Sequence, residues 1–234
     1  MSHEAPAVLV VAKAPVAGQA KTRLSPMIGA AAAADLAAAA LLDTLDAAIE
    51  AAGRLGTGPA VLALTGDLGQ AARRAEIRAT VRTCRVIPQR GDGFDARLVA
   101  AHADAAGSGG GAVLQIGMDT PQVDAGLLVR CAGKLANADA VLGPAVDGGW
   151  WVLAVRRSVI AEAILGVPLS TDRTGVLTRS ALRGGGRTVI EAPRLRDVDT
   201  MADAWAVAAL APQTRFAVTL AALRVAGQAR TIAS

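Results

Sequence analysis

The stretch AVLVVA, residues 7–12, is an unbroken apolar run that includes three β-branched valines. A continuous run of this length is typical of a strand that is buried on both faces of a sheet. Similar short runs recur further along the chain, at Ala60–Leu64, Ala112–Ile116, Ala138–Leu142 and Trp151–Val155. The sequence therefore predicts a sheet of mostly buried strands.

Helical stretches lie between these runs, and strands that alternate with helices indicate an α/β fold. The predicted helices cover Ala30–Ala52, Asp95–Ala106, Asp124–Ala136 and Thr200–Leu210, and Phe216–Val225 also has helical spacing. We expect one doubly wound, mostly parallel sheet flanked by helices. No internal repeat or linker interrupts the pattern, so residues 1–234 are predicted to form a single domain.

Composition favours a compact cytoplasmic enzyme over a nucleic-acid-binding or membrane protein. Its 24 basic and 20 acidic residues give a net charge of +4, without a Lys/Arg run longer than two. Such a balance suits a small anionic substrate but only weakly. The most apolar long stretch, Ile28–Leu42, contains Asp35 and is too short to span a membrane. We find no signal peptide, and Cys84 and Cys131 suggest no disulfide framework.

The connection from Lys13 to Pro26 has no apolar periodicity, and a loop of this size is uncommon unless it has a function. Lys21 and Arg23 lie just before the next predicted helix, and both side chains suit phosphate oxygens. Gly18 would let the backbone approach a ligand closely. The alternative is an ordinary solvated surface loop. The loop contains no Walker A motif, and no G-x-G-x-x-G follows the first strand.

Acidic residues occupy the ends of several predicted elements. Asp119 directly follows the run AVLQIGM, Asp147 lies in GPAVDGGWW, and Asp197 and Asp199 lie in LRDVDT, just before a helix. These positions can meet at one edge of the sheet, where carboxylates suit Mg²⁺ or Mn²⁺.

Each acidic residue also has a structural alternative. Asp199 or Thr200 could cap the following helix, Asp147 could form a turn, and Asp119 could begin an Asx turn.

Other chemistries have little support. His3 lies in a predicted tail and His102 in the middle of a predicted helix, so neither indicates a catalytic histidine, and the chain lacks the ligand pattern of a zinc site. No G-x-S-x-G motif of a serine hydrolase occurs. Trp150 and Trp151 are consecutive in a strand, so they should face opposite sides, one in the core and the other available to a substrate.

Seven motifs occur in a recognisable order along the chain: AKAPVAGQAKTRLSP, LLDTL, PQRGDGFDARL, GMDTPQV, GPAVDGGWW, VPLST and LRDVDT. The series resembles a bacterial family of uncharacterised proteins, domain of unknown function 2064, with the GT-A or nucleotide-diphospho-sugar transferase fold. The resemblance runs from about Val8 to about Trp205. More distantly, the chain is similar to phospholactate guanylyltransferases, and its DVDT segment to sugar-acid cytidylyltransferases.

The resemblance implies that Asp119 and Asp199 ligate Mg²⁺ or Mn²⁺. It also implies that Lys21 and Arg23 contact phosphates, in a loop where Lys13 and Gly18 are further candidates for substrate binding.

The same resemblance implies two substrate-facing segments. Gln89 to Arg97, with Gly91 between them, would face the base or phosphates, and Asp147, Gly148 and Gly149 would line the acceptor pocket.

The chain departs from the pattern of these relatives at three places, which concern the identity of the acceptor more than the metal site. Met118 replaces a small residue, Trp150 and Trp151 replace paired tyrosines, and Leu169 replaces a tryptophan.

These features predict a metal-dependent transferase with a nucleotide donor. The K-T-R-L loop suits a triphosphate, which favours nucleotidyl transfer to a small anionic acceptor with release of pyrophosphate. The alternative is glycosyl transfer from a nucleotide sugar, and a further alternative is a nucleotide-binding protein without catalysis.

Overall fold

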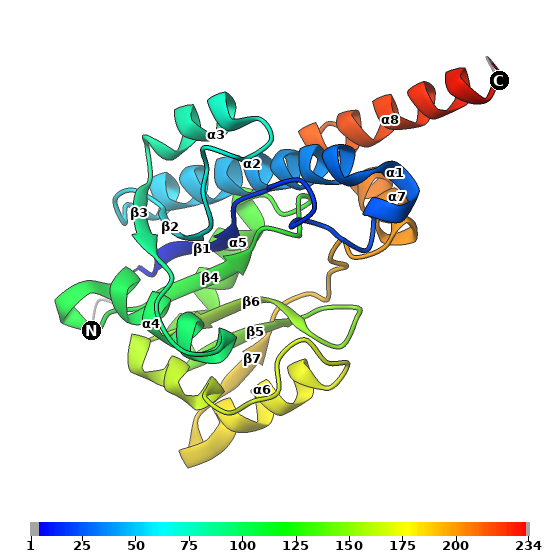
Figure 1. Cartoon of the computed structure of the whole chain (residues 1–234). Helices are drawn as coiled ribbons and strands as arrows, with labels where there is room; N and C mark the ends of the chain where they lie inside the picture. The colour runs from blue at the N-terminus through cyan, green and yellow to red at the C-terminus, as the bar shows by residue number, and fades with distance from the viewer. Residues whose placement is uncertain (1–4, 233–234) are drawn as a thin grey trace.

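The computed structural model describes residues 5–232, with side chains described as far as residue 225. Its strands form one mixed sheet in the order β3-β2-β1-β4-β6-β5-β7 (Figure 1). All pairings are parallel except the two that β6 makes with β4 and β5. The strands are β1 (Ala7–Lys13), β2 (Val61–Thr65), β3 (Arg85–Pro88), β4 (Val113–Gly117), β5 (Ala140–Pro144), β6 (Trp150–Val155) and β7 (Val189–Glu191). The prediction of a mostly parallel sheet is confirmed.

The reversed direction of β6 follows from its connection to β5. A parallel crossover needs a dozen or more residues, whereas the segment 145–149 is short enough for a hairpin. The turn at Asp147 therefore returns the chain antiparallel to β5, with Ala140 opposite Val155 at the far end. This hairpin keeps Asp147 at the same edge of the sheet as the end of β5.

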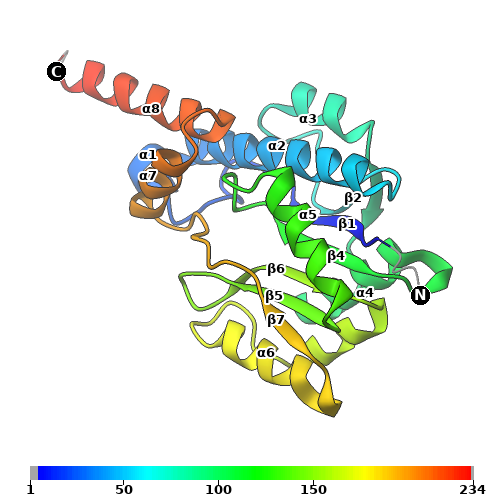
Figure 2. The same ribbon diagram turned by 180° about the vertical axis from the view of Figure 1, so that it is seen from behind.

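Helices cover both faces of the sheet, as the predicted doubly wound fold requires (Figures 1 and 2). Alternate residues of β1 show the division, because Val8 and Val10 pack into one core cluster whereas Leu9 and Val11 pack into another. The first face carries α2 (Ala30–Leu55) and α5 (Ala125–Gly133), and the second carries α4 (Phe94–Ala106), the 3-10 helix η3 (Ser158–Ile164) and α6 (Thr174–Arg183).

A third cluster joins the C-terminal helices to the loop after β1. Buried Leu24, Leu36, Val198 and Phe216 pack together in it. The helices involved are α1 (Ser25–Ile28), α2, α7 (Met201–Leu210) and α8 (Arg215–Ile232). The packing holds the connector between β7 and α7 beside the loop that carries the predicted basic residues.

Helix α3 (Arg74–Val81) covers the same face of the sheet as α2 and α5, because its Ile77 belongs to their core cluster. It lies above β2 and β3 in Figure 1. Helix α8 extends the predicted Phe216–Val225 segment at both ends, and both views show it projecting past α2. Among the described residues, no helix is long and apolar enough to cross a membrane.

Candidate active site

A cavity of about 710 Å³ opens where the carboxyl ends of β1, β2 and β4 meet. Ligands of open α/β sheets bind at this edge, outside the strand ends. Among the residues predicted to act in a site, those that line this cavity are Lys13, Arg23, Gln89, Arg97, Asp119, Asp147, Gly149, Asp197 and Asp199. The structure thus brings together residues from most of the length of the chain.

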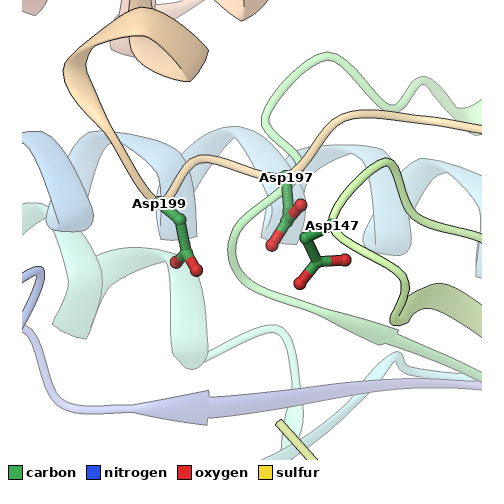
Figure 3. A group of neighbouring side chains, drawn as sticks. All are labelled: Asp147, Asp197 and Asp199. Atoms are coloured by element: carbon green, nitrogen blue, oxygen red, sulfur yellow. The ribbon is translucent and has the colours of Figure 1, made fainter. Parts of the chain in front are cut away.

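Three carboxylates converge at one side of the cavity (Figure 3). One oxygen from each of Asp147, Asp197 and Asp199 lies within 4.8 Å of the others. Figure 3 shows Asp147 on the β5–β6 turn, and Asp197 and Asp199 on the connector that leads into α7, with all three carboxylates directed to the same side. Hard divalent cations prefer such oxygen ligands, so this donor set fits Mg²⁺ or Mn²⁺.

Backbone hydrogen bonds place the turn and the connector side by side. The amide of Val146 donates to the carbonyl of Leu195 at 2.9 Å, and the amide of Leu195 donates to the carbonyl of Pro144 at 3.1 Å. The Asp147 carboxylate accepts from the amide of Gly149 at 2.8 Å, which closes an Asx turn. Asp147 therefore does form the turn that the sequence suggested, and that turn directs its carboxylate toward Asp197.

The Asp197 carboxyl is perturbed by its surroundings in the trio. Burial, followed by repulsion from Asp147 and Asp199, raises its pKa to about 6, whereas the Lys21 ammonium acts in the opposite direction. Repulsion among carboxylates that share a small volume favours either a proton or a bound cation.

Asp119 does not belong to this trio, because it is engaged by Lys21. The Lys21 ammonium lies 2.7 Å from Asp119 Oδ1 and 4.0 Å from Asp199 Oδ1, and it donates to the carbonyl of Val198. The Val198 amide donates to the carbonyl of Asp119 at 3.0 Å. Lys21 therefore ties three segments together: the loop after β1, the end of β4 and the connector.

The expected contact of Lys21 with phosphate stays a prediction beside this role. The Lys21 side chain is 8% exposed, and it lines a smaller adjoining cavity of about 250 Å³. Its φ of 48° is left-handed, a conformation that costs energy for a residue with a Cβ.

Arg23 is the exposed counterpart of Lys21. Its guanidinium lies 2.7 Å from Asp199 Oδ2, and its side chain is 73% exposed. Asp199 is available for this pair because Thr200, rather than Asp199, caps α7 in a reciprocal capping box with Asp203. Of the two capping residues suggested by the sequence, the structure selects Thr200.

The opposite side of the cavity is basic and aromatic. Lys13 lies at the end of β1, and Phe94 and Arg97 lie in the first turns of α4, with the Arg97 guanidinium carbon 5.8 Å from the centre of the Phe94 ring. The Gln89 amide nitrogen donates to the carbonyls of Ala12 and Ala63 at 2.9 and 3.0 Å. Gln89 thus joins the ends of β1 and β2 in addition to lining the cavity.

Sequence and structure comparisons agree with this architecture. The model of a family described as an uncharacterized protein conserved in bacteria, DUF2064, matches residues 44–171, more than half of the chain. The chain belongs to the DUF2064 family. No curated protein matches it.

Solved structures similar to this DUF2064 protein share its fold. A candidate nucleotide-diphospho-sugar transferase from Desulfovibrio desulfuricans is 26% identical, with a TM-score of 0.78 and coverage of 96% of this chain and 95% of that one. A cytidylyltransferase from Leptospira borgpetersenii is 16% identical, with a TM-score of 0.53 and coverage of 86% and 84%. A 4-diphosphocytidyl-2C-methyl-D-erythritol synthase from Anaerococcus prevotii is 12% identical, with a TM-score of 0.53 and coverage of 94% and 99%. The fold is that of the nucleotide-diphospho-sugar transferases.

Three glycines predicted to bind substrate do not line the main cavity of the DUF2064 protein. A Cβ on Gly148 would lie 2.0 Å from the carbonyl oxygen of Asp172, so this position is restricted by packing between two loops. Gly91 packs similarly, since its Cβ would lie 3.0 Å from Ala96. Gly18 is in an exposed turn with a φ of 77°.

The two tryptophans do face different sides, as predicted. Trp151 is buried, and its indole nitrogen donates to the carbonyl of Pro193 at 2.8 Å. Trp150 packs against the other core cluster and lines the cavity, so it is the one available to a substrate.

The histidine in α4 has a structural role, whereas His3 lies outside the described residues. His102 is completely buried, and its Nε2 lies 2.9 Å from Gln115 Oε1 in β4. Burial lowers the pKa of His102 to about 4, so the imidazole is neutral at pH 7. The pair attaches α4 to β4 of the sheet.

Several lining residues have no role in the sequence prediction. The segment from Ser170 to Asp172 belongs to this group, whereas Asp197 is among the acidic residues expected at this edge and Phe94 lies within the expected Gln89–Arg97 segment. The 170–171 positions fall inside the quoted motif VPLST, which is the signal that could have identified them.

Proposed function

We propose that this protein is a divalent-metal-dependent transferase with a nucleotide donor, and that it transfers a nucleotidyl group. The observation that carries the proposal is one cavity with a carboxylate trio on one side and Lys13, Arg23 and Arg97 in its lining. A nucleotide polyphosphate with its metal requires this combination, because the metal needs carboxylates and the phosphates need cations.

Asp147, Asp197 and Asp199 would hold Mg²⁺ or Mn²⁺, since their oxygens are close enough to share one ion. The metal would supply positive charge that polarises phosphoryl oxygens and stabilises the leaving group. Asp119 remains a predicted ligand: its Oδ1 lies 2.7 Å from the Lys21 ammonium, which leaves the second carboxylate oxygen available. Lys21 holds the connector in place, and therefore positions Asp197 and Asp199.

The remaining charged groups would orient the donor. Arg23 is exposed beside Asp199, where its planar fork can bind phosphate oxygens and neutralise their charge. Among the described residues, neither Lys13 nor Arg97 forms an ion pair, so both charges can act on a ligand. Together with the paired but exposed Arg23, these two cations suit a triphosphate, from which an acceptor attack on the α-phosphorus would release pyrophosphate.

Glycosyl transfer is the second candidate. The similarity to a candidate nucleotide-diphospho-sugar transferase at 26% identity favours it. In that reaction, an acceptor would attack C1 of the donor sugar, and a nucleoside diphosphate would leave.

Calorimetric titration with each nucleoside triphosphate and each nucleotide sugar tests the proposal, with Mg²⁺, with Mn²⁺ and with a chelator. We expect metal-dependent binding of a triphosphate that Asp199→Asn weakens and that Glu162→Gln, an exposed site on η3, leaves unchanged. Metal-dependent binding of nucleotide sugars alone would favour glycosyl transfer. If neither ligand class binds, or if binding ignores the metal, the proposal is wrong.

A further inference from the structure

The charged residues of the cavity are separated along the sheet. Strand order places β1, β2 and β3 on one side of β4, and β6, β5 and β7 on the other. Lys13 and Arg97 line the side formed by β1 and α4, which we call the basic half. Asp147, Asp172 and Asp197 line the side formed by the β5–β6 turn, the loop before α6 and the connector, which we call the acidic half.

The cations near the boundary are already balanced by carboxylates. Arg23 pairs with Asp199 at 2.7 Å, and Lys21 pairs with Asp119 at 2.7 Å. Arg196, next to Asp197 in the chain, pairs with Asp203 at 2.7 Å instead of facing the cavity. Among the described lining residues, the acidic half contributes no lysine or arginine.

The loop that carries Asp172 is held in a defined position. The Thr174 hydroxyl accepts from the Thr171 amide at 3.0 Å and donates to the carbonyl of Pro168 at 2.9 Å. The Asp172 backbone lies against Gly148, where a Cβ would not fit. Asp172 is therefore presented to the cavity by a loop docked on the Asp147 turn.

The other lining groups of the acidic half are an indole, an aliphatic side chain and hydroxyls. Trp150 and Leu169 line it beside Ser170, whose side chain has no intramolecular hydrogen bond among the described residues. An aromatic face packs against the C–H groups of a ring, and carboxylates accept hydrogen bonds from hydroxyls. Even with a divalent metal on the carboxylate trio and with Arg23 paired to Asp199, the four carboxylates of this side outweigh the cations, so a phosphate or carboxylate in the same place would meet net negative charge.

We propose that the acidic half binds a neutral acceptor with several hydroxyl groups, such as a sugar or polyol, and that Asp172 and Trp150 recognise it. This rests on the proposed function for the donor, and it replaces the small anionic acceptor expected from the sequence. In the transfer, a hydroxyl oxygen of the acceptor forms the new bond to the α-phosphorus. The bond to pyrophosphate breaks with its electron pair remaining on the pyrophosphate, and the hydroxyl proton passes to water.

Ligand-observed saturation-transfer NMR on the full chain tests the proposal without requiring turnover. The probes are matched pairs: glycerol with glycerol 3-phosphate, glucose with glucose 6-phosphate and with gluconate, and myo-inositol with its monophosphate. We expect at least one neutral probe to bind about fivefold to tenfold more tightly than its anionic partner, as repulsion by exposed carboxylates implies.

Variants assign that preference to the acidic half. Trp150→Ala should abolish saturation transfer to the neutral probe, and Asp172→Lys should reverse the preference toward the anionic partner. Glu162→Gln should leave both signals unchanged. Circular dichroism establishes that each variant is folded.

The result that overturns the proposal is an anionic probe that binds the wild type as well as its neutral partner does, or a panel in which no probe binds. A preference unaffected by Asp172→Lys would also overturn it. Calorimetry with nucleotide and metal separates the two proposals. Nucleotide binding combined with an anionic preference refutes only the acceptor class, whereas neutral probe binding without nucleotide binding refutes only the donor.

Discussion

Acidification should destabilise this protein through a single histidine. His102 is completely buried against Gln115, and burial lowers its pKa to about 4 from an ordinary value of 6.5. Between these two values the unfolded chain binds a proton at this position that the folded chain excludes. The stability that His102 contributes is therefore fully present above pH 6.5 and is lost as the pH falls toward 4.

The size of the effect follows from the two pKa values. Linkage gives a loss of about 2 kcal/mol in the free energy of unfolding between pH 7 and pH 5 from this residue.

Urea unfolding followed by circular dichroism at pH 7 and pH 5 measures this loss. His102→Gln is the matched variant, since its amide can donate to Gln115 but does not titrate. Other titrating groups act on both proteins, so the difference between them isolates His102. We expect the wild type to lose about 2 kcal/mol more than the variant. If both proteins lose the same stability, the imidazole is not buried in neutral form and the explanation is wrong.

Three further predictions concern the edge of the sheet. Asp199→Asn should weaken Mn²⁺ binding at least about tenfold, because it removes one charged ligand of a shared ion. Calorimetry without nucleotide measures this affinity, and an unchanged value would exclude Asp199 as a metal ligand. Lys21→Met should lower the free energy of unfolding by about 1–2 kcal/mol, since it leaves the partly exposed Asp119 carboxylate unpaired. Lys134→Met, at the half-buried residue that follows α5 and donates a 3.3 Å hydrogen bond to the Glu191 carbonyl, should change it little. Equal effects of the two substitutions in urea unfolding would refute the tether. Gly148→Ala should lower the free energy of unfolding by about 3 kcal/mol or more, because the new Cβ would collide with the facing loop. Gly18 has a similar positive φ but open space around it, so Gly18→Ala should cost only about 1 kcal/mol. Similar losses in the two variants would contradict the packing explanation.

The strands that could be predicted are those buried on both faces, because their burial is visible as a continuous apolar run in their own sequence. The run in β1 is apolar at every interior position because both faces are covered, and β4 departs from this only at the buried Gln115, which pairs with His102. Strands β3 and β7 escaped prediction because both are short and partly exposed, so neither has a continuous buried run. Their pairing depends on the neighbours β2 and β5, which a local pattern does not contain.

The site divides in a similar way. That Asp119 lies at the functional edge could be predicted, since the end of a buried parallel strand is a local property. Its partner could not, because the pair with Lys21 depends on a left-handed backbone and on a connector far along the chain. Asp197 and Asp147 meet because backbone hydrogen bonds pair two loops that are distant in the sequence. The spacing of residues along the chain does not predict such a pairing.

The pairing of Arg23 with Asp199, 176 positions later, has a consequence for synthesis on the ribosome. The basic half of the cavity is synthesised first, whereas Asp197 and Asp199, the last two members of the carboxylate trio, are synthesised later. An incomplete chain can therefore present cations to nucleotides before it has a complete metal site. Any activity that depends on all three carboxylates begins only once the connector has left the exit tunnel and docked beside β4.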